Sequence, residues 1–324
     1  MISDRIKAMP AQTNTSRDVV VVTGACGFIG AHCTHLFARE RWRVLGVDRR
    51  RPAPEASVRP TLDGFLQDEL VSINGLADLL AREKPRALIH AAGPANVEQS
   101  MRDPRGDFLA QVLPWLTTLE AVRRASPSTR VALCSSAAVY GAPDTYPICE
   151  TTPARPISPY GFHKVVKEQM LSEYVSLHGL TGSAARIFST FGPGLDQLAV
   201  FDIARKARKG ELTLEGAGNE TRDYLYVEDV AAAIRTIAVS APGAGEAINV
   251  ASGVETEIAD LARRIAAYFG TSDARISATG RIAEGKPSRW RADVRQLAAL
   301  GFSPSVPFAT GLERTLDWIA EHAR

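Results

Sequence analysis

The stretch SPYGFHK at residues 158–164 places a tyrosine and a lysine four positions apart. On a helix, residues at this spacing lie one above the other on the same face, so Tyr160 and Lys164 would form a phenol with a fixed cation beside it. The cation stabilises the phenolate, and such a phenol can act as a general base near neutral pH. An ordinary surface tyrosine and lysine would have the same spacing.

A hydroxyl that could act on the same substrate oxygen is Ser136. It ends the apolar stretch VALCSS at 131–136 and lies 24 residues before Tyr160. The carboxyl ends of parallel strands face the ligand crevice, so Ser136 could hydrogen-bond the oxygen that Tyr160 deprotonates. It could also satisfy a backbone group at the strand end.

The sequence indicates a phosphate-binding turn at TGACGFIG, residues 23–30, which carries Gly24, Gly27 and Gly30. Glycines there permit a tight turn after a strand, close approach of a pyrophosphate to the backbone, and close packing of the following helix. The first N–H groups of that helix would point at the phosphates. We therefore predict a dinucleotide site.

The choice between NAD and NADP depends on the end of the second predicted strand. Asp48 ends this strand, 18 residues after Gly30, where an acid accepts hydrogen bonds from the ribose hydroxyls of NAD and repels the 2′-phosphate of NADP. Arg49 and Arg50 follow and would favour NADP, but the position of Asp48 favours NAD. Asp68, at the end of the third strand, either faces the adenine or is an ordinary loop acid.

The elements that must position these groups alternate along the chain. We predict strands at 18–24, 43–48, 64–68, 86–93, 131–141 and 183–190, and helices at 28–40, 73–83, 106–124 and 158–178. Strands alternating with helices predict an α/β fold with a Rossmann-like, doubly wound parallel sheet. The valine run in the first strand predicts burial on both faces.

The alternation weakens after about residue 190, where glycine and proline become frequent, and it returns in part at 224–250. We expect a dinucleotide-binding domain of residues 19–188 plus about 224–250. A smaller, discontinuous substrate-binding lobe would contain about 189–223 plus 251–324, with the small-molecule cleft between the two. Residues 1–18 lack the apolar core of a signal peptide and are expected to be a flexible tail.

Composition excludes several classes of protein. The 324 residues carry 45% hydrophobic and 23% charged side chains and a net charge of only +2, which argues against a nucleic-acid surface. The four cysteines form no CxxC pair or metal-ligand spacing, so we expect reduced thiols, no metal site and a cytoplasmic location. No apolar run is long enough to span a bilayer, so no membrane partner is expected.

Short motifs along nearly the whole chain resemble the extended short-chain dehydrogenase/reductases, specifically the NAD-dependent epimerase/dehydratase family of nucleotide-sugar enzymes. The motifs are TGACGFIG at 23–30, HAAG at 90–93, SSAAVYG at 135–141, SPYGFHK at 158–164, RIFSTFGPG at 186–194, TRDYLYVEDVA at 221–231, INVASG at 248–253 and GFSPSVPFATGLERTLDWI at 301–319. Their shared order and spacing make the resemblance specific.

The resemblance implies that Ser136, Tyr160 and Lys164 are the catalytic triad, with Lys164 also holding the nicotinamide ribose. It implies that Ser189 lies near the nicotinamide and the sugar. Further contacts with the cofactor are implied for Phe28, Ile29, Ala91, Ala92 and Phe188.

The substrate diphosphate is assigned by the same resemblance to Arg222. A guanidinium binds phosphate bidentately, and Arg222 follows a glycine-rich loop, GAGNET. The alternative is a surface salt bridge with Asp223 or Glu220. Arg289 and Arg291 are weaker candidates for the diphosphate.

Three departures from the family pattern affect the expected reaction. Dehydratases of the family usually carry an acidic pair where this chain has Ala137 and Ala138, which argues against a 4,6-dehydratase. Many relatives have asparagine at the position of Ser189. PANV at 94–97 replaces a segment in which relatives often carry glutamine or another polar residue.

The resulting prediction is an NAD-dependent nucleotide-sugar epimerase that acts at the sugar C4 through a transient 4-keto intermediate. One alternative is an NAD(P)H-dependent reductase of a nucleotide 4-keto-6-deoxy sugar. A second is a catalytically silent dinucleotide-binding protein. The resemblance also suggests a homodimer built from the helices near 106–124 and 160–178. Val165, Val166 and Leu171 would lie either in that interface or against their own sheet.

Overall fold

The computed structural model describes residues 17–53, 56, 58–210, 212–271, 276–280 and 287–322. The expected flexible tail, 1–18, lies outside these ranges except for its last two residues. The Arg17 side chain donates to the carbonyl of Arg41 at 2.8 Å, and Asp18 forms an ion pair with Arg86 at 2.5 Å. Residues 17 and 18 therefore already contact the folded part of the chain.

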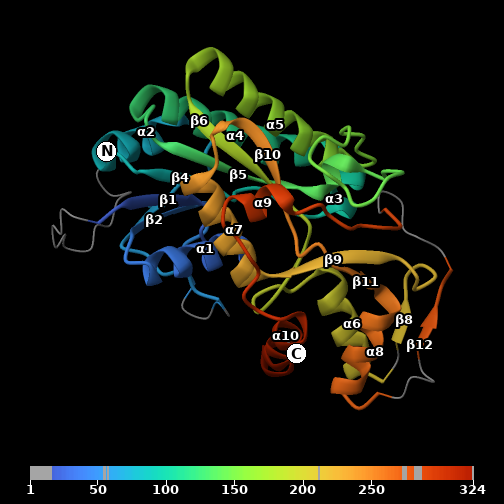
Figure 1. Cartoon of the computed structure of the whole chain (residues 1–324). Helices are drawn as coiled ribbons and strands as arrows, with labels where there is room; N and C mark the ends of the chain where they lie inside the picture. The colour runs from blue at the N-terminus through green and yellow to red at the C-terminus, as the bar shows by residue number, and fades with distance from the viewer. Residues whose placement is uncertain are drawn as a thin grey trace.

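A seven-stranded sheet forms the larger part of the molecule (Figure 1). Every neighbouring pair of strands is parallel. The chain order runs outward from β1 in one direction and from β4 in the other, so the switch point at which such sheets bind ligands lies between these two strands. In spatial order the strands are β10 (Ala244–Val250), β6 (Thr181–Ile187), β5 (Arg130–Ser136), β4 (Ala87–His90), β1 (Val19–Thr23), β2 (Arg43–Asp48) and β3 (Gly64–Gln67).

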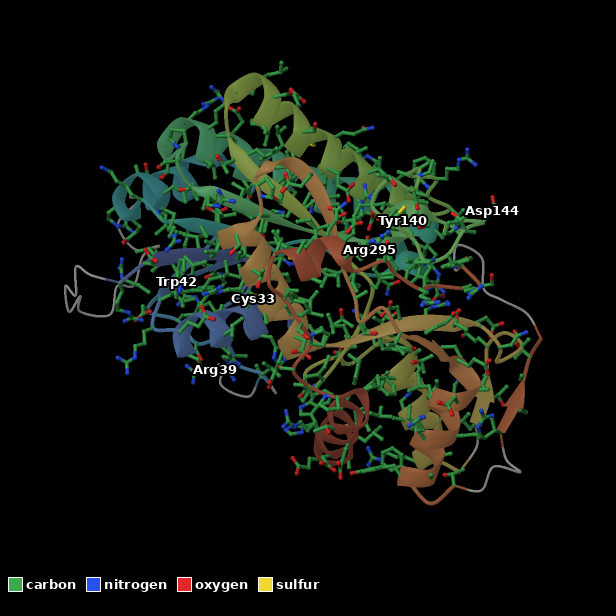
Figure 2. All side chains as sticks on the ribbon, viewed as in Figure 1. Cys33, Arg39, Trp42, Tyr140, Asp144 and Arg295 are labelled. Atoms are coloured by element: carbon green, nitrogen blue, oxygen red, sulfur yellow. The ribbon has the colours of Figure 1, made fainter. Side chains whose placement is uncertain are left out.

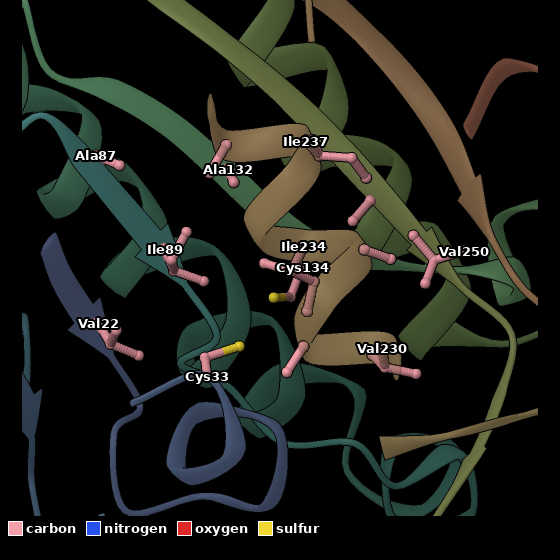
Figure 3. Packing of buried hydrophobic residues seen from close by; sticks show 14 of the residues in the cluster. Val22, Cys33, Ala87, Ile89, Ala132, Cys134, Val230, Ile234, Ile237 and Val250 are labelled. Atoms are coloured by element: carbon pink, nitrogen blue, oxygen red, sulfur yellow. The ribbon is translucent and has the colours of Figure 1, made fainter. Parts of the chain in front are cut away.

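Helices cover both faces of this sheet and bury its apolar side chains. One face carries α1 (Phe28–Arg39) and α7 (Val227–Ser240), and the other carries α2 (Ile73–Glu83), α4 (Pro104–Ala125) and α5 (Pro159–His178). Val20 and Val22 of β1 pack on the α1/α7 face, while Val21 packs on the opposite face. Figure 3 shows the α1/α7 core, where Val22 and Ile89 lie across from Ile234.

The other part of the chain builds two smaller sheets and a third core, at the lower right of Figure 1. The larger of the two joins β11 (Glu255–Glu257), β9 (Thr221–Tyr226) and β7 (Ser189–Phe191), and the smaller pairs β12 (Ile276–Ala278) with β8 (Leu212–Leu214). Their covering helices are α6 (Leu198–Arg208), α8 (Ile258–Tyr268) and α10 (Phe308–His322). Within the described ranges there are also three short helices: α3 (Val97–Arg102), the 3₁₀ helix η2 (Ala137–Tyr140) and α9 (Arg295–Ala299).

Polar side chains fasten the segment before α9 to η2 and β10. Tyr140 donates its hydroxyl proton to Asn249 at 2.7 Å, and the Asn249 amide donates to the carbonyl of Asp293 at 3.1 Å. Asp293 forms an ion pair with Arg295 at 2.5 Å. Figure 2 shows Tyr140 and Arg295 near the centre of the molecule, between the large sheet and the smaller ones. The C-terminal third of the chain is therefore connected to the end of β5.

The predicted doubly wound α/β fold is confirmed, but the single strand predicted at 183–190 is wrong at its end. Phe188 separates β6 from β7, and β7 belongs to the small sheet. An apolar run does not reveal where a strand changes sheets. The division into two lobes stays a proposal. β9 of the small sheet runs to residue 226, so the first part of the substrate-binding lobe is better ended after 226 than after 223. Leu297 packs in the α1/α7 core, so α9 is better assigned to the dinucleotide-binding domain.

Candidate active site

The turn after β1 leaves the N-terminus of α1 open. Gly27 is the N-cap of α1 and has no side chain to accept from the first N–H groups, and the first turn contains no acidic residue. A helix start of this kind presents unpaired backbone donors and a partial positive charge. It can therefore hold a pyrophosphate, as the glycine spacing predicts. Phe28, Ile29 and Gly30 form this first turn.

Gly24 brings this turn against the loop that follows β4. Its φ is +71°, and a Cβ there would lie 2.7 Å from the carbonyl carbon of Ala91 and the nitrogen of Ala92. A larger residue at position 24 would thus be strained and would clash with the backbone. The structure places Ala91 and Ala92 beside the glycine turn, at the switch point of the sheet.

Asp48 closes the turn from the end of β2. Its two carboxylate oxygens accept the backbone N–H groups of Cys26 at 3.0 Å and Arg50 at 2.9 Å. A carboxylate has about four lone-pair sites, so acceptor capacity remains for ribose hydroxyls. Burial, with a further contribution from Asp48, raises the pKa of the Cys26 thiol to about 11. Cys26 therefore stays a neutral thiol beside the turn.

Arg49, Arg50 and Asp68 are the remaining cofactor candidates near this turn, and their contacts give less support for binding the cofactor. The Arg49 and Arg50 side chains are exposed, and Arg50 Nε lies 3.9 Å from the Asp48 carboxylate. Asp68 follows β3 and accepts the N–H of Leu70 at 2.6 Å. This contact matches the loop-acid interpretation of Asp68. Any contact with an adenine stays a prediction.

Ser136 ends β5 and begins η2. Its hydroxyl accepts the backbone N–H of Ala138 at 3.2 Å, so Ser136 is the N-cap of this short helix. The backbone-satisfying interpretation is thus correct for one lone pair of the hydroxyl. The hydroxyl proton is not used by this bond and can be donated to a substrate oxygen.

The start of α5 is built to hold Tyr160. Ser158 caps the helix by accepting the N–H of Gly161 at 3.2 Å, and Pro159 occupies the first turn. The N–H of Tyr160 donates to the Ser100 hydroxyl at 3.1 Å, which ties α5 to α3. Tyr160 is 8% exposed. Its hydroxyl makes no hydrogen bond within the described part of the chain, so it is free to bind a substrate.

Lys164 lies under Tyr160, as the four-residue spacing predicts. Its ammonium nitrogen is 5.3 Å from the centre of the Tyr160 ring and donates to the carbonyl of Cys134 at 3.1 Å. Cys134 precedes Ser136 by two residues on β5, so this bond joins α5 to the strand that ends in Ser136. The structure thus brings Tyr160, Lys164 and Ser136 to one edge of the sheet.

Gly161 and Ser100 are site residues that the sequence analysis missed. A Cβ at Gly161 would lie 2.6 Å from the carbonyl oxygen of Ala138, so only glycine lets α5 approach η2 this closely. Gly161 appears in the sequence between two residues already singled out, and its closeness to η2 could have been suspected. Ser100 lies 60 residues before Tyr160 in the chain, and no local signal connects them.

Phe188 and Ser189 lie at the junction of the two sheets. Phe188 is buried, its N–H donates to the carbonyl of Val250 at 3.0 Å, and its ring lies 5.8 Å from that of Trp290. Ser189 begins β7 and pairs with Tyr224 of β9. This position is compatible with the expected contacts with nicotinamide and sugar, which stay predictions.

Arg222 on β9 is a mostly buried cation. Its guanidinium stacks on the Trp290 ring at 5.4 Å and donates to the carbonyl of Thr221 at 2.7 Å. No carboxylate lies within ion-pair distance of it in the described ranges. Burial lowers the pKa of Arg222 from its ordinary value. A buried cation without an anionic partner is costly, which points to an anionic ligand.

The salt-bridge alternative for Arg222 is wrong. Asp223 accepts from the Ser252 hydroxyl at 2.7 Å and from three backbone N–H groups. Glu220 accepts the N–H groups of Ala217 and Gly218, both at 2.8 Å. Both carboxylates therefore stabilise loops and leave Arg222 unpaired.

The weaker candidates, Arg289 and Arg291, are used differently. Arg289 is 47% exposed and pairs with both oxygens of Glu255, while its guanidinium lies 4.5 Å from the Tyr146 ring. Arg291 donates to the carbonyl of Gly253 at 3.4 Å. Arg222 is the better placed of the three for binding an anion in a buried setting.

Two other kinds of site are absent from the described residues. Among them, no group of three or more His, Cys, Asp or Glu side chains could hold a metal ion. In the same residues, no helix is both long enough and apolar enough to cross a membrane. The four cysteines are free thiols.

Comparison with known proteins gives consistent matches. A sequence model of the NAD dependent epimerase/dehydratase family matches residues 20–251. A UDP-glucose 4-epimerase of Mycolicibacterium smegmatis is 31% identical, over 92% of this chain and 97% of its own. A dTDP-glucose 4,6-dehydratase of Xanthomonas campestris is 27% identical, over 92% of both chains.

A solved structure has the same fold as this chain. The UDP-glucose 4-epimerase of Thermus thermophilus, in complex with NAD, superposes with a TM-score of 0.84 at 28% identity. The match covers 94% of this chain and 100% of that one. The similarity in fold therefore extends over nearly the whole chain.

Proposed function

Because the chain belongs to the NAD-dependent epimerase/dehydratase family, we propose that it is an NAD-dependent nucleotide-sugar epimerase that acts at the sugar C4. The observation that carries this proposal is the arrangement of Tyr160, Lys164 and Ser136. The tyrosine hydroxyl has no hydrogen-bond partner among the described residues, the lysine ammonium lies beneath its ring, and the serine retains a free proton at the adjacent strand end.

The residues of the chain fit a bound NAD. The uncapped start of α1 suits the pyrophosphate, Gly24 keeps the backbone of the turn close to Ala91, and Asp48 has lone pairs left for ribose hydroxyls. Lys164 would hold the nicotinamide ribose. When bound, NAD supplies a hydride acceptor and donor for the sugar carbon. We infer NAD rather than NADP from the position of Asp48.

The catalytic side chains have separate tasks. Tyr160 removes the proton from the C4 hydroxyl and later returns it. Ser136 keeps its proton and donates a hydrogen bond to the C4 oxygen as the ketone develops, and Lys164 stabilises the phenolate. Turning of the 4-keto sugar between the two hydride transfers would invert C4.

Arg222 would anchor the substrate diphosphate. It is half-buried, has no carboxylate partner among the described residues and stacks on Trp290, and a phosphate would supply the missing negative charge. The nucleotide is not indicated by these contacts. UDP-sugars are the first to test, because a relative similar over almost its whole length is a UDP-glucose 4-epimerase.

The dehydratase reaction of other family members is less well supported. Residues after Ser136 in η2 are Ala137, which is fully buried, and Ala138. Neither can remove or deliver a proton at C5 or C6 of a sugar. The proposed proton and hydride transfers are therefore confined to C4 of the sugar.

A reductase of nucleotide 4-keto-6-deoxy sugars is the second candidate, because Arg49 and Arg50 are exposed beside Asp48 and could bind the extra phosphate of NADPH. Absorbance at 340 nm separates the two. An epimerase converts UDP-glucose and UDP-galactose with no net change, whereas a reductase consumes the reduced cofactor.

The experiment is a turnover assay on purified protein with UDP-, GDP-, dTDP- and CDP-sugars. Tyr160→Phe should abolish turnover and still bind NAD. The matched control is Tyr268→Phe, because Tyr268 is exposed on α8, far along the chain from the site. Normal activity in Tyr160→Phe would refute the assignment. Bound NAD without turnover of any sugar nucleotide would favour a silent binding protein.

We also propose a homodimer through α4 and α5. Five large apolar side chains on α4 and in the first turn of α5 are at least 36% exposed: Phe108, Leu109, Leu113, Leu116 and Phe162. Leu171, in contrast, is fully buried in its own core, and Val165 and Val166 are half-buried. Leu109→Glu with Leu116→Glu should give monomers in sedimentation, and Leu177→Glu, at an exposed site on α5, should not. A cytoplasmic location stays a prediction.

A further inference from the structure

A buried ion pair joins α5 to β6 beside the candidate catalytic side chains. Arg186 of β6 donates to the carboxylate of Glu168 on α5, at 2.8 Å from Nη2 and at 3.1 Å and 3.2 Å from Nε. The two side chains are only 11% and 12% exposed. Glu168 lies four residues after Lys164, so it is one turn further along the face of α5 that carries Lys164 and Tyr160.

The ion pair is bonded to the chain on both sides of Ser136. Before Ser136, the Ser135 hydroxyl donates to Glu168 Oε1 at 2.5 Å. After it, Arg186 Nη1 donates to the hydroxyl of Tyr140 at 2.9 Å. Tyr140 is the last residue of η2, which begins after Ser136 as its N-cap. One ion pair on the α5 side therefore holds both ends of the short segment that contains Ser136.

The bonds of Glu168 fill its capacity as an acceptor. It accepts one bond from Ser135 and three from Arg186, and a carboxylate has about four lone-pair sites. Arg186 uses its other terminal nitrogen, Nη1, on the Tyr140 hydroxyl and on the carbonyl of Glu150 at 3.0 Å. The pair therefore acts on its neighbours in the fold and not directly on a substrate.

The charges of the group favour a lasting bond to η2. Burial alone would lower the pKa of Arg186, but the hydrogen bonds and the negative charge of Glu168 outweigh it and raise this pKa above its ordinary value. Burial raises the pKa of Tyr140 to about 12, so the phenol keeps its proton near neutral pH. Tyr140 donates that proton to Asn249 and accepts from Arg186.

We propose that Glu168 and Arg186 are positioning residues that fix the distance between the Ser136 hydroxyl and the Tyr160 hydroxyl. Ser136 belongs to the β5–η2 segment and Tyr160 to α5, so their separation depends on bonds between these elements. The catalytic roles of both hydroxyls are those of the proposed function, on which this inference rests. A displacement of about 1 Å at a catalytic group can lower turnover about a hundredfold.

Two single variants break the bonds on either side of Ser136 and leave the ion pair in place. Ser135→Ala removes the bond to Glu168, and Tyr140→Phe removes the bond from Arg186. We expect each to lower kcat about three- to tenfold, with KM within about twofold, because the substrate contacts are retained. Since kcat is expressed per folded molecule, a loss of stability alone would not lower it.

The matched control for the tyrosine variant is Tyr174→Phe. Tyr174 lies on the same helix, α5, and its hydroxyl also donates to a carboxylate, that of Glu120 at 2.9 Å. This bond joins α5 to α4 and contacts neither β5 nor η2. We expect kcat of Tyr174→Phe to stay within about twofold of the wild type.

Removal of the whole ion pair separates positioning from stability. Replacing both members of a buried ion pair by apolar side chains often leaves stability unchanged, so Glu168→Leu combined with Arg186→Met should fold. Its kcat should fall about thirtyfold or more, with KM within about twofold. The control is Glu40→Leu combined with Arg235→Met, which removes a partly exposed ion pair between the end of α1 and α7 and should leave kcat unchanged.

Crystal structures supply a readout that needs no turnover. In the double variant of Glu168 and Arg186, the distance from Ser136 Oγ to the Tyr160 hydroxyl should differ from the wild-type distance by more than about 0.5 Å. Unmoved hydroxyls, or an unchanged kcat in the folded double variant, would overturn the proposal.

Two further outcomes remain decisive. If the double variant did not fold, the same two measurements on Ser135→Ala and Tyr140→Phe would decide, and unchanged values in both would overturn the proposal. If the wild type turned over no sugar nucleotide, the proposed function would fail. The distance between the two hydroxyls would then still show whether the ion pair sets their position.

Discussion

Replacing Arg222 by methionine should make the protein more stable and bind its substrate less well. The guanidinium is mostly buried with no carboxylate partner in the described ranges, and an unpaired buried charge costs several kcal/mol. Stacking on Trp290 returns about 0.5–2 kcal/mol, and the bond to the Thr221 carbonyl returns a similar amount. We therefore expect Arg222→Met to raise the free energy of unfolding by about 1–3 kcal/mol.

The loss in binding follows from the charged hydrogen bonds. Each bond from a guanidinium to a phosphate is worth about 1.5–3 kcal/mol, so a bidentate contact contributes about 3 kcal/mol or more. Since about 1.4 kcal/mol corresponds to a factor of ten, the Kd for UDP should rise roughly a hundredfold. Isothermal titration calorimetry with UDP and urea denaturation measure the two effects on the same sample.

The control is Arg289→Met, because Arg289 is exposed and already paired with Glu255. An exposed ion pair contributes about 0–1 kcal/mol, so both quantities should change little. If Arg222→Met bound UDP as tightly as the wild type, Arg222 would not be the diphosphate anchor. If it lost stability, the unpaired charge would be better satisfied in the fold than its contacts indicate.

Three further predictions concern α5 and the cofactor turn. Gly161→Ala would place a Cβ 2.6 Å from the Ala138 carbonyl oxygen, so kcat should fall at least about tenfold. The free energy of unfolding, measured by urea denaturation, should fall by up to about 2 kcal/mol. An unchanged kcat would contradict the close-approach role of Gly161. Asp48→Asn should raise the ratio of the Kd for NAD to that for NADP, measured by fluorescence titration, and an unaltered ratio would argue against the ribose assignment. Because the unfolded chain binds a proton on Lys167 up to about pH 10.5 and the fold disfavours it, stability should rise with pH between the lowered pKa and 10.5, by up to about 1.4 kcal/mol per pH unit. Lys167→Met should flatten this slope as the pH falls below about 10.5 in urea titrations, and identical slopes would show that the fold does not disfavour the proton on Lys167.

Local patterns in the sequence were sufficient for the large sheet and for part of the site. The valine run of β1 predicted burial on both faces, because alternate side chains of one strand point to opposite sides. The spacing of Tyr160 and Lys164 predicted their shared face, because both lie in one helix. Such relations span a few residues and follow from the geometry of a single element.

Relations between distant segments could not be read in this way. The contact of Ser100 with Tyr160 joins α3 to α5, and the split of a predicted strand at Phe188 depends on a second sheet that no local pattern announces. Lys167 would be interpreted from sequence as a solvent-exposed charge. Its burial depends on how α4 and β4 pack around α5, which only the folded chain determines.

Two of the junctions between the large and small sheets are unusually short. Phe188 alone separates β6 from β7, and α7 begins at the residue after β9 ends. Because both connections are this short, a hinge rotation of one half against the other would have to break the hydrogen bond from the Phe188 N–H to the Val250 carbonyl. Substrate entry and product departure should therefore depend on movements of the surrounding loops, so turnover should respond to changes in those loops rather than to changes at a hinge.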